Sequence, residues 1–307
     1  MTLGVLLMTY GSPAPDLHDL PEYLAAVRGG REAPAGLVAE FRRRYRVIGG
    51  SPLIPITLRQ AEAVQERLRD EGVDAVATVG MRFSRPTVLD GLTALGEAGC
   101  ESVTAIIMSP QYSPLLMDGY QRALNEARAE LGRRAPTVHL APAWHRARGF
   151  IAAVAERIQD GLSTLPDEPP VLLTAHSLPR RVADEEPAYL EQLRETAELV
   201  ADASGLDAGR WHFCWQSAGH EPGEWMKPDF ADLLPRLRAG GHSAVLVAPI
   251  QFLADHLEIL YDVDIGARGQ AEEAGMAFAR IESLNTSPTF IGALARIAQG
   301  AAAVGSA

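Results

Sequence analysis

The pattern that most constrains this chain is the alternation of short apolar runs with longer amphipathic stretches. In the first half, four apolar runs have the length of buried strands. The stretches between them repeat apolar residues about every 3.6 positions and end at Gly, as helices do. The predicted strands are Gly4–Met8, Val73–Gly80, Ser102–Pro110 and Thr137–Trp144, and the predicted helices are Thr57–Gly72, Pro86–Gly99 and Leu116–Gly132. These repeats predict a parallel sheet with helices on both faces.

The second half repeats the pattern. Its predicted strands are Pro170–Ser177, Trp211–Gly219, Ser243–Ile250 and Met276–Leu284, and its predicted helices are Glu186–Gly205, Phe230–Gly241 and a C-terminal helix from Pro288. The first strands of the two halves also resemble each other, with "GVLLMTYGSP" in one and "PVLLTAHSLP" in the other. Either the two halves share one strand order, or α/β units simply look alike at this level.

We expect an α/β protein with two similar Rossmann-like domains, each a four-stranded parallel sheet flanked by helices, and a cleft between them. The expected domains span residues 1–150 and 151–307, the second ending in the C-terminal helix. Ligands of doubly wound sheets bind beyond the carboxyl ends of the strands. Two facing domains would then bring together Tyr10, Ser113, His176, Gln216 and His256.

Composition excludes several classes of function. The net charge of −11 argues against binding to nucleic acid, whose phosphates need a basic surface. The two cysteines, Cys100 and Cys214, stand alone, so we expect neither a disulfide framework nor a four-thiolate iron–sulfur cluster. Isolated cysteines are typical of proteins from a reducing compartment, so we expect a cytoplasmic protein. The chain contains no stretch of 18 consecutive apolar residues, so we expect no membrane span. It also contains neither of the glycine-rich motifs that bind dinucleotides or nucleoside triphosphates.

The densest group of acidic residues lies between Gln251 and Asp264, after one predicted strand. Asp255, Glu258 and Asp262 are three and four residues apart, so on a helix they share one face. Stacked carboxylates repel one another unless a cation or a proton lies among them. The row is either a solvated helix face or a path for metal ions or protons.

Two residues at predicted strand ends could do chemistry. His176 ends a strand of the second half, and its imidazole beside Glu258 could accept protons or hold a metal in passing. The alternative is a structural histidine. Tyr10 ends the first strand of the other half, where a phenol either contacts a ligand or covers the strand end.

The segment 26–51 is rich in arginine in an otherwise acidic chain. It contains Arg28, Arg31, Arg42, Arg43, Arg44 and Arg46. Some of these belong to a solvated helix face. Several guanidinium groups near a cleft also suit the capture of carboxylates, because each can bind two oxygens at once.

These motifs together resemble the ferrochelatases. The matching segments run in order along almost the whole chain: "MTYGSP", "RYRVIGGSPL", "SPQYS", "TAHSLP", "WQSAG", "EW-x-x-P" and "FLADHLEILYDVD". The resemblance implies an enzyme that inserts Fe(II) into a free porphyrin in haem biosynthesis. It implies no cofactor beyond the substrate iron, and a possible transient partner that takes the product.

The resemblance also implies the roles of the site residues. His176 and Glu258 match the family's pair at the metal, Asp262 matches the next acid on the same helix, and residues 12–52 form one lip of the cleft. "TYGSP" resembles the class that uses coproporphyrin III, in which Tyr10 faces the metal from the opposite side. Matches to the propionate contacts of that class are Arg28, Arg44, Ser51, Ser113 and Tyr120.

Two departures and three alternatives accompany this resemblance. Phe83 stands where some relatives have His, and the acidic row stops at Asp264, so an outer metal site is doubtful. The alternatives are a protoporphyrin IX ferrochelatase, a haem carrier without chelatase activity, and a chelatase for sirohydrochlorin-type rings. The last class typically has a His pair at the metal, where this chain has His and Glu.

Overall fold

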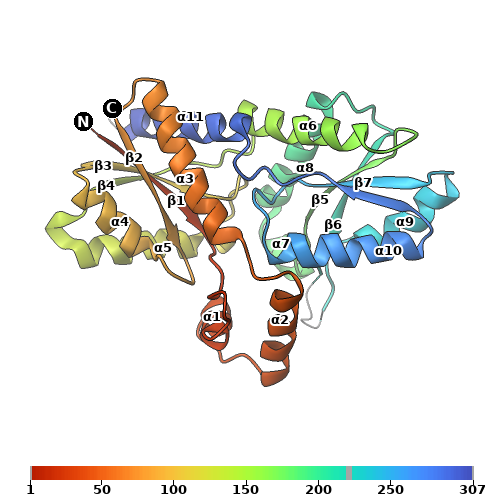
Figure 1. Ribbon diagram of the computed structural model, residues 1–307, viewed down its shortest axis with the longest axis horizontal. Coiled ribbons are helices and arrows are strands. Elements are labelled where there is room, and N and C mark those ends of the chain that lie inside the picture. The colour runs from red at the N-terminus through yellow and green to blue at the C-terminus, as the bar shows by residue number, and fades with distance from the viewer. Residues whose placement is uncertain (1, 219–222, 306–307) are drawn as a thin grey trace.

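The computed structural model describes residues 2–218 and 223–305. It contains two four-stranded parallel sheets, with β1–β4 in the first and β5–β8 in the second (Figure 1). The strand order is β2-β1-β3-β4 in one sheet and β6-β5-β7-β8 in the other, so the second sheet repeats the order of the first. The prediction of an α/β fold with two similar Rossmann-like, four-stranded parallel sheets flanked by helices is confirmed.

The first sheet is formed by strands close to the predicted ones. They are β1 (Leu3–Thr9), β2 (Ala75–Met81), β3 (Ser102–Ile107) and β4 (Thr137–Leu140), flanked by α3 (Leu53–Asp70), α4 (Val88–Glu97), α5 (Pro114–Leu131) and the short η1 (Gly132–Arg134). Helix α3 begins at Leu53 rather than at the predicted Thr57. Pro55 is tolerated there, because backbone N–H groups in the first turn of a helix make no intrahelical hydrogen bond. Thr87 and Asp90 cap α4 reciprocally.

The second sheet follows the same plan. Its strands are β5 (Val171–His176), β6 (Trp211–Gln216), β7 (Ala244–Pro249) and β8 (Ala277–Arg280), accompanied by α7 (Arg180–Glu185), α8 (Pro187–Ala203), α9 (Phe230–Ala239), the π-helix η2 (Glu258–Ala267) and α10 (Arg268–Glu273). Every residue of β7 is buried, as expected for a central strand of a parallel sheet covered on both faces. The last residue of the predicted strand Trp211–Gly219 lies outside the described residues.

Two helices join the two halves. Helix α6 (Arg148–Ser163) leaves the first half and packs on β7 and α8, whereas the C-terminal helix α11 (Pro288–Gly305) returns to pack on α3 and β3 (Figure 1). The Thr104 hydroxyl of β3 donates a hydrogen bond to the Ala298 carbonyl of α11 at 3.0 Å. One continuous apolar core therefore runs through both halves. The predicted domain boundary near residue 150 stays a prediction. Helix α11 belongs to the second half in sequence but packs on the first sheet, so a cut at one point in the chain does not separate the two sheets.

The lip, residues 12–52, projects from the two sheets as the helices α1 (Leu20–Val27) and α2 (Ala35–Val47) (Figure 1). It has a small apolar core of its own, centred on buried Leu20, Leu24 and Tyr45. Leu257, the residue before the π-helix, packs into this core from the second half. The lip therefore contacts the part of the chain that carries Glu258 and Asp262.

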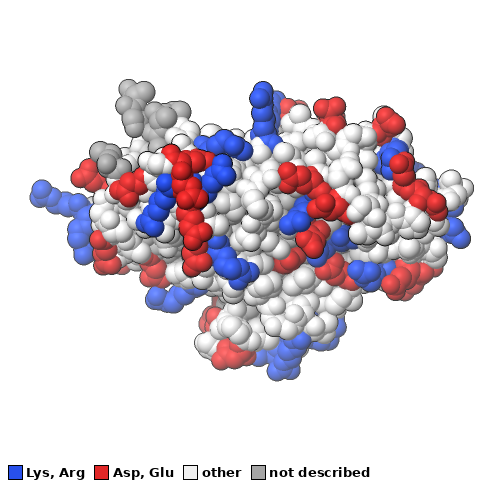
Figure 2. All heavy atoms as spheres, turned by 45° about the horizontal axis from the view of Figure 1, so that its top comes forward, with Lys and Arg blue, Asp and Glu red and all other residues white. Residues whose placement is uncertain are grey.

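Within the described residues, no helix is long and apolar enough to cross a bilayer. On the face shown in Figure 2, basic and acidic side chains alternate among uncharged ones and no continuous basic stripe is visible. That face offers no extended track for a polyanion, in keeping with the overall negative charge.

Candidate active site

The candidate residues lie at the topological switch points of the two sheets. In each sheet the first strand lies between the second and the third, so the chain leaves it in one direction and crosses back on the other side. Ligand sites of doubly wound sheets form at the carboxyl ends of those strands. Tyr10 follows β1, while His176 ends β5.

His176 is held in one orientation by its neighbours. Its backbone N–H donates to the Gln251 side-chain oxygen at 2.9 Å, and its Nδ1 lies 2.6 Å from the Ser177 carbonyl oxygen. A carbonyl only accepts, so Nδ1 carries the proton and Nε2 of the neutral ring is left with its lone pair. That Nε2 points to Glu258, 3.8 Å from Oε2. This distance is longer than a hydrogen bond, and both groups remain available to a third atom.

Glu258 lies between two imidazoles. His256 also directs Nε2 at the same carboxylate oxygen, at 3.7 Å, while its Nδ1 contacts the Ala254 carbonyl. Burial alone would raise the pKa of Glu258, but the positive charge that His176 gains when it is protonated, together with the hydrogen bond and charge of His256, outweighs it and lowers the pKa to about 2. The carboxylate is therefore ionised at neutral pH and can attract a cation.

Asp262 lies near Glu258 on the π-helix. Because a π-helix bonds residue i to i+5, its turn is wide enough that residues four apart remain on one face. Burial and the neighbouring Glu258 charge both raise the pKa of Asp262, while Arg44 lowers it. The Arg44 guanidinium reaches Asp262 Oδ1 at 3.2 Å from helix α2 of the lip. Asp262 consequently holds a proton more readily than Glu258 does.

The prediction that Asp255 shares the helical face of Glu258 and Asp262 is wrong. Asp255 precedes the helix, and its carboxylate contacts Arg280, Ser283 and Asn285. Asp264, the predicted end of the acidic row, is paired with Arg280 at 2.7 Å. A spacing of three residues implies a shared face only inside a helix, and the chain is not helical at Asp255.

Tyr10 is placed by a turn that needs glycine. Gly11 has φ +87°, and a Cβ there would lie 2.1 Å from the Ser84 hydroxyl oxygen. The Tyr10 side chain is 45% exposed at the end of β1. Partial burial raises the pKa of Tyr10, Arg82 lowers it, and the Glu258 charge raises it further. The phenol of one half is therefore within electrostatic range of the carboxylate of the other.

Arg82 lies among three aromatic rings beside Tyr10. Its guanidinium carbon is 4.6 Å from the Phe83 ring centre, 5.5 Å from that of Tyr120 and 5.9 Å from that of Tyr10. Tyr120 is buried, and burial raises the pKa of its hydroxyl. Phe83 packs edge-to-face on Tyr10 at 4.9 Å, so this position supplies an aromatic contact and no metal ligand.

The remaining predicted contacts are distributed around the lip and the strand ends. Arg28 ends helix α1, and its buried Nε has no hydrogen-bond partner in the described part of the chain. Arg44 contacts Glu40 and Asp262 and stacks on Tyr261 at 5.0 Å. Ser51 accepts from the Leu53 N–H at the start of α3, and Ser113 is fully buried where α5 begins.

The structure adds two residues, Gln251 and Arg82, to the sequence-based set, where they contact His176 and Tyr10. It also places His256, which the sequence predicted at the cleft, against Glu258. The position of His256 in "ADHLE", two residues before Glu258, is a signal that the sequence contains. Gln251 and Arg82 carry no comparable signal, because their partners are far away in the sequence.

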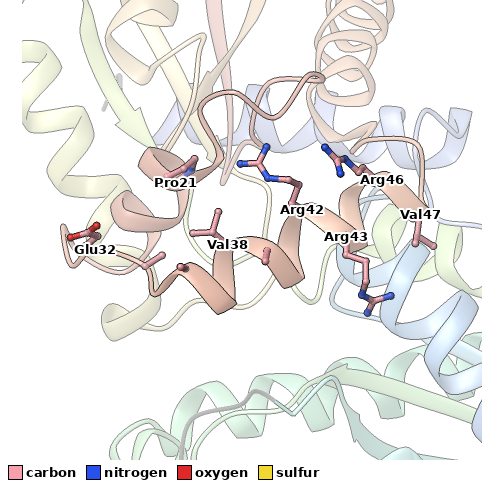
Figure 3. A pocket seen from close by; sticks show the side chains of 10 residues that line it. Pro21, Glu32, Val38, Arg42, Arg43, Arg46 and Val47 are labelled. Atoms are coloured by element: carbon pink, nitrogen blue, oxygen red, sulfur yellow. The ribbon is translucent and has the colours of Figure 1, made fainter.

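A surface cavity of 790 Å³ lies elsewhere, on the lip (Figure 3). It is lined by Pro21, Val38, Arg42, Arg46 and Val47, among others, and by none of the residues matched to the metal or propionate contacts. Figure 3 shows Arg42 and Arg46 extending from one side of α2 and Arg43 from another. We therefore locate the candidate site by the convergence of titratable groups rather than by this cavity.

Among the residues that the structure describes, no group of three or more His, Cys, Asp or Glu side chains has the arrangement of a metal cage. The convergent pair His176 and Glu258 supplies one imidazole nitrogen and one ionised carboxylate. Closed structural zinc sites use four protein ligands. A two-ligand arrangement leaves coordination positions for other donors.

Comparison with known proteins decides the family. The family model described as Ferrochelatase matches residues 2–302. The chain belongs to the ferrochelatase family. Members of this family are enzymes, metal chelatases that insert a metal ion into a porphyrin in haem biosynthesis.

Curated ferrochelatase relatives match at nearly full length. A ferrochelatase from Deinococcus radiodurans is 39% identical over 306 residues, covering 98% of this chain and 96% of the relative. A coproporphyrin III ferrochelatase from Geobacillus sp. (strain WCH70) is 34% identical, with 96% of each chain covered. The enzyme class predicted from the sequence is therefore confirmed.

The fold is shared with solved chelatase structures of low sequence identity. SirB from Bacillus subtilis with Fe3+ superimposes with a TM-score of 0.64 at 11% identity, covering 100% of this chain and 98% of SirB. CbiX, titled the terminal enzyme for the biosynthesis of sirohaem in denitrifying bacteria, gives a TM-score of 0.54 at 13% identity, with 98% and 99% covered. At such identities the likeness concerns the fold alone.

Proposed function

We propose that this ferrochelatase inserts Fe(II) into coproporphyrin III to give coprohaem. His176 and Glu258 would hold the metal on one side of the ring, and Tyr10 would face it from the other. The observation that carries the proposal is the convergence of an imidazole and an ionised carboxylate from separate segments: Nε2 of His176 and Oε2 of Glu258 lie 3.8 Å apart, and the Glu258 charge also acts on the Tyr10 phenol.

The reaction releases two protons, and the site supplies groups to accept them. Two pyrrole N–H bonds break while Fe(II) binds all four ring nitrogens, so Fe(II) replaces two protons. His176 Nε2 has the free lone pair of a general base. Asp262, whose pKa is raised, can take a proton next and pass it toward solvent, while ionised Glu258 stabilises the incoming cation.

The lip and the relatives support coproporphyrin III as the substrate. It carries four carboxylates, and the buried Arg28 Nε is a donor that lacks an acceptor among the described residues. Arg44 shares its guanidinium with Glu40 and Asp262, and an arginine has five N–H donors, so a carboxylate could join them. Ser51, Ser113 and Tyr120 are the other proposed contacts. Several relatives at 30–34% identity are named coproporphyrin III ferrochelatases.

Protoporphyrin IX is the alternative substrate. The name of the Deinococcus relative specifies no porphyrin, so it supports both choices equally. Protoporphyrin has two carboxylates where coproporphyrin has four, so it would engage fewer of the proposed propionate contacts. We further propose a cytoplasmic enzyme that needs no cofactor besides its substrate iron and transfers its product to a transient partner.

Anaerobic Fe(II) insertion into both porphyrins tests the substrate. We expect a higher kcat/KM on coproporphyrin III, and a higher value on protoporphyrin IX would overturn that part of the proposal. The variants His176→Ala and Glu258→Ala test the site. Each should abolish insertion while porphyrin still binds, as measured by quenching of porphyrin fluorescence. Near-normal turnover in either variant would contradict the assignment.

A further inference from the structure

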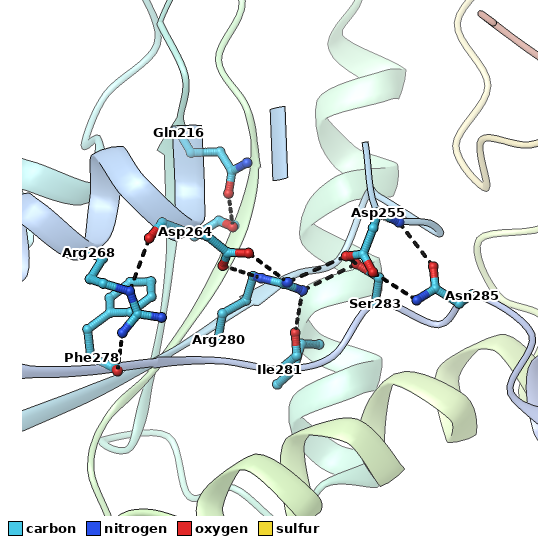
Figure 4. A network of polar contacts seen from close by, with 10 residues as sticks. Gln216, Asp255, Asp264, Arg268, Phe278, Arg280, Ile281, Ser283 and Asn285 are labelled. Carbon is cyan, nitrogen blue, oxygen red and sulfur yellow. Dashed lines mark hydrogen bonds and ion pairs between the residues drawn. The ribbon is translucent and has the colours of Figure 1, made fainter. Parts of the chain in front are cut away.

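One side chain holds both ends of the segment that carries Glu258 and Asp262. Arg280, the last residue of β8, donates from Nε and Nη2 to the two carboxylate oxygens of Asp264, at 2.7 and 3.0 Å. On its other side, Nη2 lies 3.4 Å from Oδ1 of Asp255 (Figure 4). Asp255 precedes Glu258 and Asp264 follows Asp262, so the guanidinium spans the functional segment.

Further contacts fix the position of the Arg280 guanidinium. Its Nη1 donates to the Ile281 carbonyl at 2.7 Å, and the Arg280 side chain is only 12% exposed. Asp255 is held independently, because Ser283 donates to Oδ1 at 2.7 Å and the Asn285 amide donates to Oδ2 at 2.9 Å. Figure 4 shows Asp264 and Asp255 on opposite sides of Arg280. Neither carboxylate can shift without breaking several charge-assisted hydrogen bonds.

The position of this segment has to be fixed because its helix is a π-helix. Residues Glu258–Ala267 form a π-helix, which is rare and occurs frequently at functional sites. A change to α-helical spacing would rotate Glu258 and Asp262 relative to each other and to His176. Asp255 and Asp264 are both held by β8 and the loop after it, so the register of the residues between them is fixed from both sides.

We propose that Arg280 is a positioning residue for metal insertion. Its guanidinium fork fixes the register of the π-helix, so that Glu258 faces His176 and Asp262 faces Arg44. The inference rests on the proposed roles of Glu258 and Asp262. Removal of groups that orient metal ligands typically reduces metal affinity or activity by about 10–100-fold.

The test compares Arg280→Gln and Arg280→Lys with a matched control, Arg157→Gln. Arg157 pairs at 3.1 Å with Glu282, close to Arg280 in the chain, and its ion pairs, with Asp160 and Glu282, do not involve the 255–264 segment. For each variant we would measure insertion kinetics, binding of Zn²⁺ alone by calorimetry, and the melting temperature.

In Arg280→Gln we expect kcat/KM for the metal to fall about 10–100-fold and Zn²⁺ binding to weaken, with the KM for porphyrin unchanged. Arg280→Lys should recover part of this loss, because an ammonium keeps the charge but not the fork. Arg157→Gln should leave metal binding and turnover unchanged.

Wild-type turnover and Zn²⁺ affinity in folded Arg280→Gln would overturn the proposal, as would equal losses in Arg157→Gln. If Arg280→Gln does not fold, Asp264→Asn decides by the same readouts, because it keeps the Asp255 contact of Arg280. His176→Ala separates the two levels of inference. An inactive His176→Ala with a normal Arg280→Gln would support the proposed site and contradict the positioning role of Arg280. An active His176→Ala would contradict the proposed site itself.

Discussion

Arg44 of the lip and Asp262 of the π-helix form an ion pair at 3.2 Å, although 218 residues separate them in the sequence. The pair joins the first half of the chain to the second at the edge of the candidate site. Leu257 packs into the lip core beside it. The lip and the acidic residues therefore form one surface, and a substrate carboxylate bound by Arg44 would lie beside Asp262.

Asp262→Asn should stabilise the fold and slow the reaction. An acid whose folded-state pKa is raised makes the folded state less stable as pH rises through that pKa, because its charged form is disfavoured. At neutral pH the amide removes the repulsion from Glu258, so the melting temperature should rise. Loss of a proton acceptor should lower kcat about a hundredfold. Unchanged turnover in Asp262→Asn would exclude a proton-transfer role.

Gly119→Ala should disturb Tyr10 without unfolding the protein. A Cβ at position 119 would lie 1.9 Å from the Arg82 guanidinium carbon, so this flexible side chain must move away from the Tyr10 ring. Arg82 lowers the pKa of Tyr10, and its displacement should raise that pKa further. An ultraviolet difference titration against Tyr10→Phe measures the change. Porphyrin affinity should fall about two- to fivefold, the worth of one exposed cation–π contact.

Acid should destabilise the protein partly through Glu195. His145 and Arg146 lie 2.8 and 2.6 Å from this carboxylate, and the Arg146 hydrogen bond, followed by that of His145, lowers the pKa of Glu195 below its ordinary 4.5. A lowered acid pKa contributes stability above 4.5, and this contribution is lost as pH falls through the folded-state value. Urea unfolding at several pH values should show a shallower acid loss in Glu195→Gln. Identical pH profiles would contradict this role.

Phe290→Ala should strongly destabilise the fold. Phe290 is fully buried on α11 and packs near Trp144, with ring centres 6.3 Å apart. Removing a buried aromatic ring costs about 3–5 kcal/mol in the free energy of unfolding. The neighbouring Thr289→Ala, which loses one exposed hydrogen bond to Glu156, serves as the control. Urea unfolding measures both variants, and a loss in Phe290→Ala no larger than in the control would show that α11 is not part of the core.

The sequence was informative wherever a property depends on neighbouring residues. The strands β1 and β5 were predictable because each is a continuous apolar run, and His176 was predictable because it ends such a run. The helical face of Asp255, by contrast, was inferred from spacing alone. It failed because Arg280, Ser283 and Asn285 offer this carboxylate better partners than a helix would.

By itself, the sequence determined the alternation of strands and helices, the repeat of that alternation, and the residue types at the strand ends. Local periodicity and backbone propensity encode these features. Only the tertiary structure decided that α11 covers the first sheet, that the helix at Glu258 is a π-helix, and that Arg44 meets Asp262. These features depend on contacts between distant segments, whose energies appear only once both sheets have packed around the shared core.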